Sequence, residues 1–265
     1  MSHACMNDSE TWLALRRFTQ ARIGLGRAGD SLPTQALLEF ALAHAQARDA
    51  VHMSLDTQQL QRQLSAAAFE SVLVHSAVTD RWQYLRRPDV GRLLSESSRH
   101  ELSARAPPSC ELLIVIADGL SALAVMRHAV PLLEALRPLI GEVALAPIVV
   151  AQQARVALGD EIGELWHARQ VVVLIGERPG LSSADSLGAY LTHTPRVGRT
   201  DAERNCISNI RLQGLSYTHA AHKLAHLLGS SRRLGCSGVG LKDESETPLL
   251  AAQHVQAGDD QTDQP

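Results

Sequence analysis

The feature of this sequence that most constrains its fold is a series of short, continuously apolar segments that alternate with helix-like stretches after residue 110. The apolar segments are 111–121 (ELLIVIADGLS), 143–151 (VALAPIVVA), 171–180 (VVVLIGERPG) and 187–193 (LGAYLTH), the last expected at a sheet edge. Helix-like sequence separates them at 121–139, with an interruption expected at Pro131, and at 161–168. Apolar strands that alternate with helices are typical of a parallel sheet covered on both faces. We therefore expect an α/β fold with a Rossmann-like parallel sheet domain that has helices on both faces.

Composition divides the chain into three parts. Residues 1–105 are expected to form a mostly helical N-terminal region, with a helix starting at Pro33-Thr34, and to serve as a subunit interface. Two prolines in 106–109 indicate a linker into the α/β domain, which spans 106–242 and closes with a C-terminal helix. Residues 243–265 are acidic, polar and free of aromatic residues, and this composition predicts a disordered tail.

Charge and composition exclude several classes of protein. A formal net charge of -3 and a pI near 6.4 give no general attraction to nucleic acid or anionic lipid. The longest apolar run is far below the roughly 20 residues that cross a bilayer, so we expect no membrane span. The first 20 residues place acids early and arginines late, the reverse of a secretion signal, which predicts a cytoplasmic protein. The cysteines stand far apart without a CxxC pair and are expected to be reduced thiols: Cys5, Cys110, Cys206 and Cys236.

Arginine gathers in two clusters of the N-terminal region. The first contains Arg16, Arg17, Arg22 and Arg27, and the second contains Arg81, Arg86, Arg87 and Arg92. Such clusters form either a solvated helix face or an interface that meets an acidic partner or a phosphate.

Two motifs resemble ligand-binding sites but lack the neighbouring residues that such sites require. GLGRAG at 24–29 matches G-x-G-x-x-G, but no apolar strand precedes it, so a dinucleotide site is not expected there. His219, His222 and His226 would share one helix face, yet no carboxylate is interleaved and HExxH is absent, which favours an amphipathic helix over a zinc site. No GxSxG sequence indicates a hydrolase.

A third group of residues follows the ends of the predicted strands, where open parallel sheets bind ligands. The group consists of Asp118, Ser121, Arg155, Val156, Glu177, Arg178, Cys206, Ser208 and Asn209. These residues either form one ligand-binding edge or act as helix caps and turns.

Several sequence blocks closely resemble the ethanolamine ammonia-lyase small subunit family. The blocks are LRRFTQARIGLGRAGDSLPTQALLEF, YLRRPDVGRLL, VIADGLSALAV, DEIGELWHARQVVVLIGERPGL and RTDAERNCISNI. The resemblance runs from about residue 12 to about residue 242, and GERPGL, CISNI and RPDxGR occur in the family's order and spacing. Two departures are expected: the leading helix that addresses some relatives to a bacterial microcompartment is lacking, and the tail after Lys242 is an extension.

The resemblance implies a function. The family deaminates ethanolamine to acetaldehyde and ammonia by a radical mechanism that uses adenosylcobalamin. A large catalytic subunit, a TIM barrel, holds the substrate, and the small subunit covers part of the cobalamin at the subunit interface. The residues implied in cobalamin contact are Val156, Glu177 and Cys206 of the 106–242 domain, with no catalytic residue and no metal ligand. The chain also lacks D-x-H-x-x-G, which implies a cofactor that keeps its own base as lower ligand.

Three alternatives stay open at this point. The chain could be a non-catalytic α/β interaction protein, a nucleotide-binding oxidoreductase that uses the GLGRAG loop, or a free-standing hydrolase. The family also implies a cytoplasmic location, with a bacterial microcompartment as the narrower setting.

Overall fold

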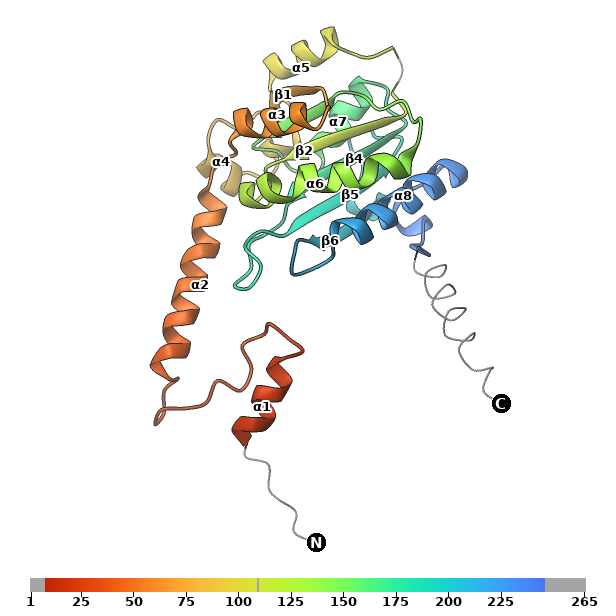
Figure 1. Cartoon of the computed structure of the whole chain (residues 1–265). Coiled ribbons are helices and arrows are strands. Elements are labelled where there is room, and N and C mark those ends of the chain that lie inside the picture. The colour runs from red at the N-terminus through yellow and green to blue at the C-terminus, as the bar shows by residue number, and fades with distance from the viewer. Residues whose placement is uncertain (1–7, 109, 246–265) are drawn as a thin grey trace, which may run out of the picture.

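A six-stranded sheet forms the centre of the computed structural model, which describes residues 8–108 and 110–245 (Figure 1). The strands are β1 (Ser71–His75), β2 (Leu112–Ala117), β3 (Ile148–Gln152), β4 (Gln170–Gly176), β5 (Leu187–His193) and β6 (Arg204–Ile210). Their order is β1-β3-β2-β4-β5-β6, and the first four run parallel. The sheet is therefore mostly parallel, but β5 runs antiparallel to both β4 and β6.

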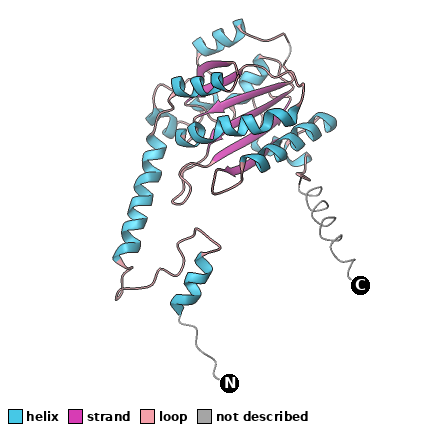
Figure 2. Ribbon diagram, viewed as in Figure 1, coloured by secondary structure: helices cyan, strands magenta, loops and turns pink. Residues whose placement is uncertain are grey.

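Helices cover both faces of this sheet, as predicted (Figure 2). The helices of the described residues are α1 (Asp8–Arg16), α2 (Thr34–His52), α3 (Thr57–Ala66), α4 (Arg81–Arg86), α5 (Glu96–Ala104), α6 (Ala122–Ile140), α7 (Leu158–Leu165) and α8 (Tyr217–Leu234). One core lies between the sheet and α3, α6 and α8, and a second lies between the sheet and α5 and α7. No helix in the described part of the chain is long and apolar enough to cross a membrane.

The continuous apolar strands are explained by burial on both faces. In β4, Val172 and Leu174 enter the core under α6 and α8, whereas Val173 and Ile175 enter the core under α7. Because successive side chains of a strand point to opposite faces, a strand between two helix layers must be apolar at every position.

Helix α6 is continuous from Ala122 to Ile140, so the predicted interruption at Pro131 is wrong. Proline removes one N–H donor from a helix, and α6 contains a second proline at Pro138. The apolar side of α6 is buried against the sheet and α8 both before and after Pro131. This packing favours a single helix over the local preference of proline.

Two strands of the sheet were not predicted from the sequence. β1 lies inside the region that was expected to be mostly helical, yet it pairs with β3 as part of the central sheet. β6 forms an outer strand of the sheet, so β5 is not the edge strand that was expected. Cys206 consequently lies in the middle of β6 opposite Tyr190 and not after the end of a strand.

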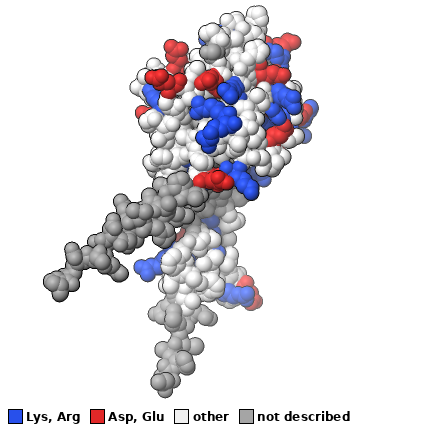
Figure 3. Space-filling model, turned by 90° about the vertical axis from the view of Figure 1, so that its right-hand side faces the viewer, with Lys and Arg blue, Asp and Glu red and all other residues white. Residues whose placement is uncertain are grey.

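Residues 8–53 form an extension that projects from the α/β body and is called the N-terminal arm below (Figure 1). In its long helix α2, which begins at Thr34 as predicted, only Ala43 and Ala50 are buried. The large apolar side chains of the arm are exposed, with Phe18 at 88% and Leu38 at 64%. Figure 3 shows charged side chains over the α/β body, whereas the part that projects below it is mostly uncharged. Most of the predicted disordered tail, residues 246–265, lies outside the described residues.

Candidate functional site

The candidate site is a cavity of about 450 Å³ at the carboxyl ends of β2 and β4, called the strand-end cavity below. It is lined by Tyr84, Gly119, Leu120, Arg155, Val156, Ile175, Gly176, Glu177, Arg178 and Tyr190. The strand ends therefore bring together Val156 and Glu177, which lie far apart in the sequence. This location agrees with the rule that open parallel sheets bind ligands beyond the carboxyl ends of their strands.

Glu177 directly follows β4 and has one carboxylate oxygen engaged within the chain. Its Oε2 atom accepts hydrogen bonds from the Ser186 hydroxyl and, at 3.2 Å, from the backbone N–H of Asn209. Within the described residues, Oε1 has no hydrogen-bond partner. Glu177 is thus held in place through one oxygen and can accept a hydrogen bond from a ligand through the other.

Val156 and Tyr84 supply one wall of the strand-end cavity. Val156 lies just before α7 and packs partly buried against the core under that helix. The Tyr84 hydroxyl donates to the carbonyl of Ala154 at 3.0 Å, and the Arg155 guanidinium lies 4.1 Å from the centre of the Tyr84 ring. Burial raises the pKa of Tyr84, so this phenol stays protonated at neutral pH. The wall is therefore built on a fully buried aromatic ring with two arginines beside it, since the Arg81 guanidinium also lies 4.7 Å from the ring centre.

Tyr190 connects Cys206 to the strand-end cavity. The two residues lie directly opposite each other across β5 and β6. Desolvation raises the pKa of the Cys206 thiol, and the negative charge of Glu177 raises it further, so Cys206 is a neutral thiol. Tyr190 lies on the α7 side of the sheet, and Cys206 and Ser208 are exposed. We call the surface of Tyr190, Cys206 and Ser208 the open shelf.

Asp118 and Ser121 have structural roles. The Asp118 carboxylate is buried and accepts the backbone N–H groups of Gln153 at 2.9 Å and Ala154 at 3.0 Å. The Ser121 hydroxyl caps α6 and donates to the carbonyl of Ala184 at 2.8 Å. For Ser121 the interpretation as a helix cap is confirmed, whereas Asp118 ties the end of β2 to the segment after β3. Arg178 lies exposed beside Glu177 at the cavity.

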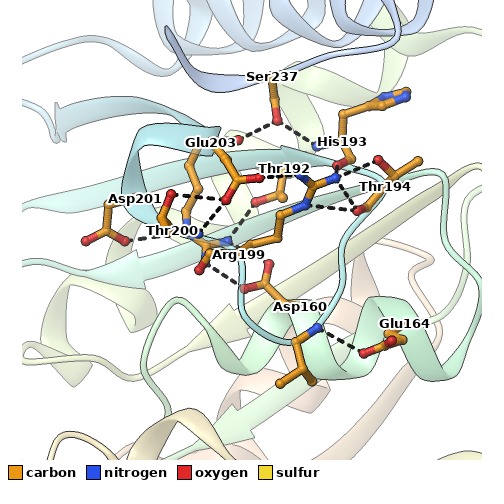
Figure 4. Close-up of polar contacts among 12 residues, drawn as sticks. Asp160, Glu164, Thr192, His193, Thr194, Arg199, Thr200, Asp201, Glu203 and Ser237 are labelled. Atoms are coloured by element: carbon orange, nitrogen blue, oxygen red, sulfur yellow. Dashed lines mark hydrogen bonds and ion pairs between the residues drawn. The ribbon is translucent and has the colours of Figure 1, made fainter. Parts of the chain in front are cut away.

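A buried polar network fixes the segment that leads into β6. Arg204 binds both carboxylate oxygens of Asp160 at 2.6 Å, and each side chain is only 2% exposed. Arg199 pairs with Glu203, which caps the short helix Asp201–Glu203 together with Thr200 (Figure 4). These contacts join β6 to α7 and hold the open shelf and the N-terminal end of α7 in a fixed relation.

The two other motifs lie outside this site. GLGRAG lies between α1 and α2, with no strand before it, so it does not have the strand-turn-helix arrangement of a dinucleotide site. His219 and His222 are exposed on α8, and no group of three or more potential metal-binding residues exists within 8–108 and 110–245. The cysteines described there, Cys110, Cys206 and Cys236, are free thiols.

Tyr84 and Tyr190, the two aromatic residues of the strand-end cavity, were not predicted from the sequence. Tyr84 lies in α4, a short helix within an arginine-rich segment, and Tyr190 lies within a predicted strand. The one available signal was that Tyr190 is the single tyrosine in the predicted strand LGAYLTH.

The fold and this cavity define an α/β protein with a candidate ligand site at the carboxyl ends of its parallel strands. Residues 9–242 match the family described as ethanolamine ammonia-lyase light chain. The chain is 57% identical over 255 residues to an ethanolamine ammonia-lyase small subunit of Xanthomonas campestris pv. campestris, with 94% of each chain covered. It is 55% identical over 253 residues to one of Pseudomonas fluorescens, with 94% of this chain and 92% of the relative covered. The chain therefore belongs to the ethanolamine ammonia-lyase light-chain, or small-subunit, family.

Proposed function

We propose that this chain is the small subunit of an adenosylcobalamin-dependent ethanolamine ammonia-lyase and helps to bind cobalamin at the interface with the catalytic large subunit. The complex deaminates ethanolamine to acetaldehyde and ammonia by a radical mechanism. The observation that carries the proposal is that Val156 and Glu177 line one cavity, to which Tyr190 connects Cys206. These are the three residues implied in cobalamin contact by the family resemblance.

The residues of the site fit such a cofactor. A corrin ring has broad apolar faces and carries amide side chains at its edge. Val156 and Tyr190 offer apolar and aromatic surface over the buried Tyr84, and the free Oε1 atom of Glu177 suits an amide N–H donor. The strand-end cavity is open and smaller than a corrin with its side chains, so it suits a subunit that covers one part of the cofactor while another chain covers the rest.

The work assigned to this chain is binding, orientation and exclusion of water. Bound adenosylcobalamin supplies the radical chemistry. Val156 and Tyr190 would keep water from one face of the cofactor, and Glu177 would fix the orientation of a corrin amide. Substrate binding is assigned to the large subunit.

The N-terminal arm suits the subunit interface that was proposed for the N-terminal region. Its exposed apolar side chains form more unpartnered apolar surface than an isolated soluble chain usually shows. Arg17, Arg22 and Arg27 add positive charge between α1 and α2, which suits an acidic surface on the large subunit. The expected location is the cytoplasm, with a bacterial microcompartment as the narrower setting.

The test is a cobalamin titration of the complex that forms when the chain is co-expressed with the large subunit. Glu177→Ala removes the proposed acceptor, and we expect a loss of about 1 to 3 kcal/mol, or about 5- to 150-fold in cobalamin affinity. Adenosylcobalamin-dependent release of ammonia should require both chains.

Two control variants separate cofactor contact from local structure. Ser186→Ala removes a partner of Glu177 Oε2 but leaves Oε1 available, so it should have a smaller effect on affinity than Glu177→Ala. His222→Ala changes an exposed residue of α8 that has no proposed role in binding. The proposal fails if Glu177→Ala binds cobalamin as tightly as the unmodified complex, or if the purified chain alone releases ammonia.

A further inference from the structure

A second cavity, of about 520 Å³, adjoins the strand-end cavity and has a different chemical character. Arg155 and Val156 line both cavities. The second one, called the arginine cavity below, is also lined by Arg92, Arg199 and Arg204, with Asp201 as its acidic residue. An excess of guanidinium groups around one cavity indicates an anionic ligand.

The arginines of this cavity differ in how their charge is balanced. Arg204 is neutralised by Asp160 and Arg199 by Glu203. Arg92 and Arg155, by contrast, have no carboxylate partner in the part of the chain that the structure describes. Asp201 lies 3.5 Å from the Nε atom of Arg204, but its side chain is 97% exposed and faces solvent. The interior of the arginine cavity therefore keeps positive charge that the chain itself does not balance.

Two buried nitrogen atoms of this cavity also lack hydrogen-bond acceptors. They are the Nε atoms of Arg155 and Arg204, and Arg204 is only 7% exposed. Buried donors without an acceptor are rare, because a group that loses water without gaining a partner costs free energy. Both atoms have almost no accessible area, so they show that the chain leaves these two guanidinium groups partly unsatisfied.

The chain holds Arg155 in position for such a role. Its backbone N–H donates to the carbonyl of Gly91 at 2.8 Å, and its Nη2 atom donates to the carbonyl of Tyr84 at 3.0 Å. A side chain at position 91 would come within 3.1 Å of Arg155 Cγ, so glycine leaves room for the arginine stem. The N-terminal end of α7 also meets this cavity at Ala157, and a helix N-terminus favours negative charge. Oxygen atoms that are shared among guanidinium forks and a helix end are characteristic of phosphate recognition.

We propose that the arginine cavity binds the phosphate group of a ligand, with Arg155 and Arg92 as its main contacts. Two sources would supply this group. One is the phosphodiester that links the corrin to its base in cobalamin, in which case one ligand spans both cavities through Arg155 and Val156. That source rests on the proposed function, whereas a separate phosphate-bearing ligand does not.

The test compares cobalamin with cobinamide, which lacks the phosphate and the base. Both are titrated into the complex with the large subunit, and inorganic phosphate is titrated into the full chain alone and followed by phosphorus NMR. The variants are Arg155→Gln and the exposed Arg92→Gln. Arg169→Gln is the control, because Arg169 is exposed and immediately precedes β4, at the opposite end of the sheet.

Charged hydrogen bonds of this kind predict that each cavity variant weakens cobalamin about 10-fold or more and leaves cobinamide within about twofold. That result supports the proposal and assigns the phosphate to the cofactor. A second result would also support the proposal but assign the cavity to a separate ligand. In that case the chain binds inorganic phosphate, both variants abolish this binding, and the ratio of cobalamin to cobinamide affinity stays unchanged. The proposal is overturned if the variants weaken the binding of cobalamin and cobinamide equally and the chain does not bind inorganic phosphate. A complex that binds neither corrinoid contradicts the proposed function alone, because the phosphate titration still decides on the arginine cavity.

Discussion

Removing one partner of the buried ion pair between Arg204 and Asp160 should be among the most destabilising single changes in this fold. The two side chains are joined by two bonds of 2.6 Å, and both are 2% exposed. Asp160→Asn keeps the shape but leaves a buried guanidinium with only the exposed Asp201 carboxylate, 3.5 Å from its Nε atom, as a counter-charge. Breaking a buried pair in this way costs about 3 to 5 kcal/mol. For a chain of this size each kcal/mol lowers Tm by about 2 to 4 °C, so we expect a fall of about 6 to 20 °C.

The assay is urea unfolding followed by circular dichroism, with a double-mutant cycle of Asp160→Leu and Arg204→Met. Each single variant leaves one charge unpaired, whereas the double variant removes both charges. Most of the lost free energy of unfolding should therefore return in the double variant, because an apolar pair avoids the desolvation of two ions. Single variants that cost less than about 1 kcal/mol, or a double variant whose loss is the sum of the two, would refute this account of the pair.

Three further outcomes are expected. Burial lowers the pKa of His128 and His193 in the folded chain, so the unfolded chain binds more protons as pH falls below about 6.5. Tm should therefore fall with pH in that range, and less steeply in His193→Gln, whereas a Tm independent of pH would contradict this. Gly119→Ala places a methyl group 2.3 Å from the carbonyl oxygen of Gly176 at a φ of +57°, so calorimetry should show a loss of at least about 1 kcal/mol. Leu38→Ser with Leu42→Ser should leave Tm nearly unchanged but weaken co-elution with the large subunit in gel filtration, unlike the same replacement at the exposed Leu234 of α8.

The sequence predicted the interior of the sheet better than its edges. β2, β4 and β5 were found within a few residues, and β3 was placed too early but in the right segment, because these strands are buried between helices and are apolar at nearly every position. β1 and β6 are outer strands with mixed burial: SVLVH has an apolar run of only three residues, and RNCISNI mixes polar and apolar residues. A polar edge strand cannot be recognised from hydrophobicity alone, since its identity as a strand comes from the neighbour with which it pairs.

The candidate site was predicted in part, for a similar reason. Val156 and Glu177 follow β3 and β4, so the topology of a parallel sheet was enough to bring them to one edge. Cys206 was assigned to the same edge, but β6 places it farther back along the sheet, and its connection to the cavity passes through Tyr190. Tyr84 could not be foreseen, because its place in the wall depends on how α4 packs against the segment after β3.

The antiparallel course of β5 has a consequence for access to the sheet. A strand that continued the parallel series would need a crossover connection, usually a helix, which would lie across one face of the sheet. The chain instead turns back directly from β4 into β5 and from β5 into β6, and among the described helices it places none over the open shelf. The route of the chain thereby leaves the open shelf uncovered by helices, and a helix inserted between β4 and β5 would cover it without changing any of its side chains.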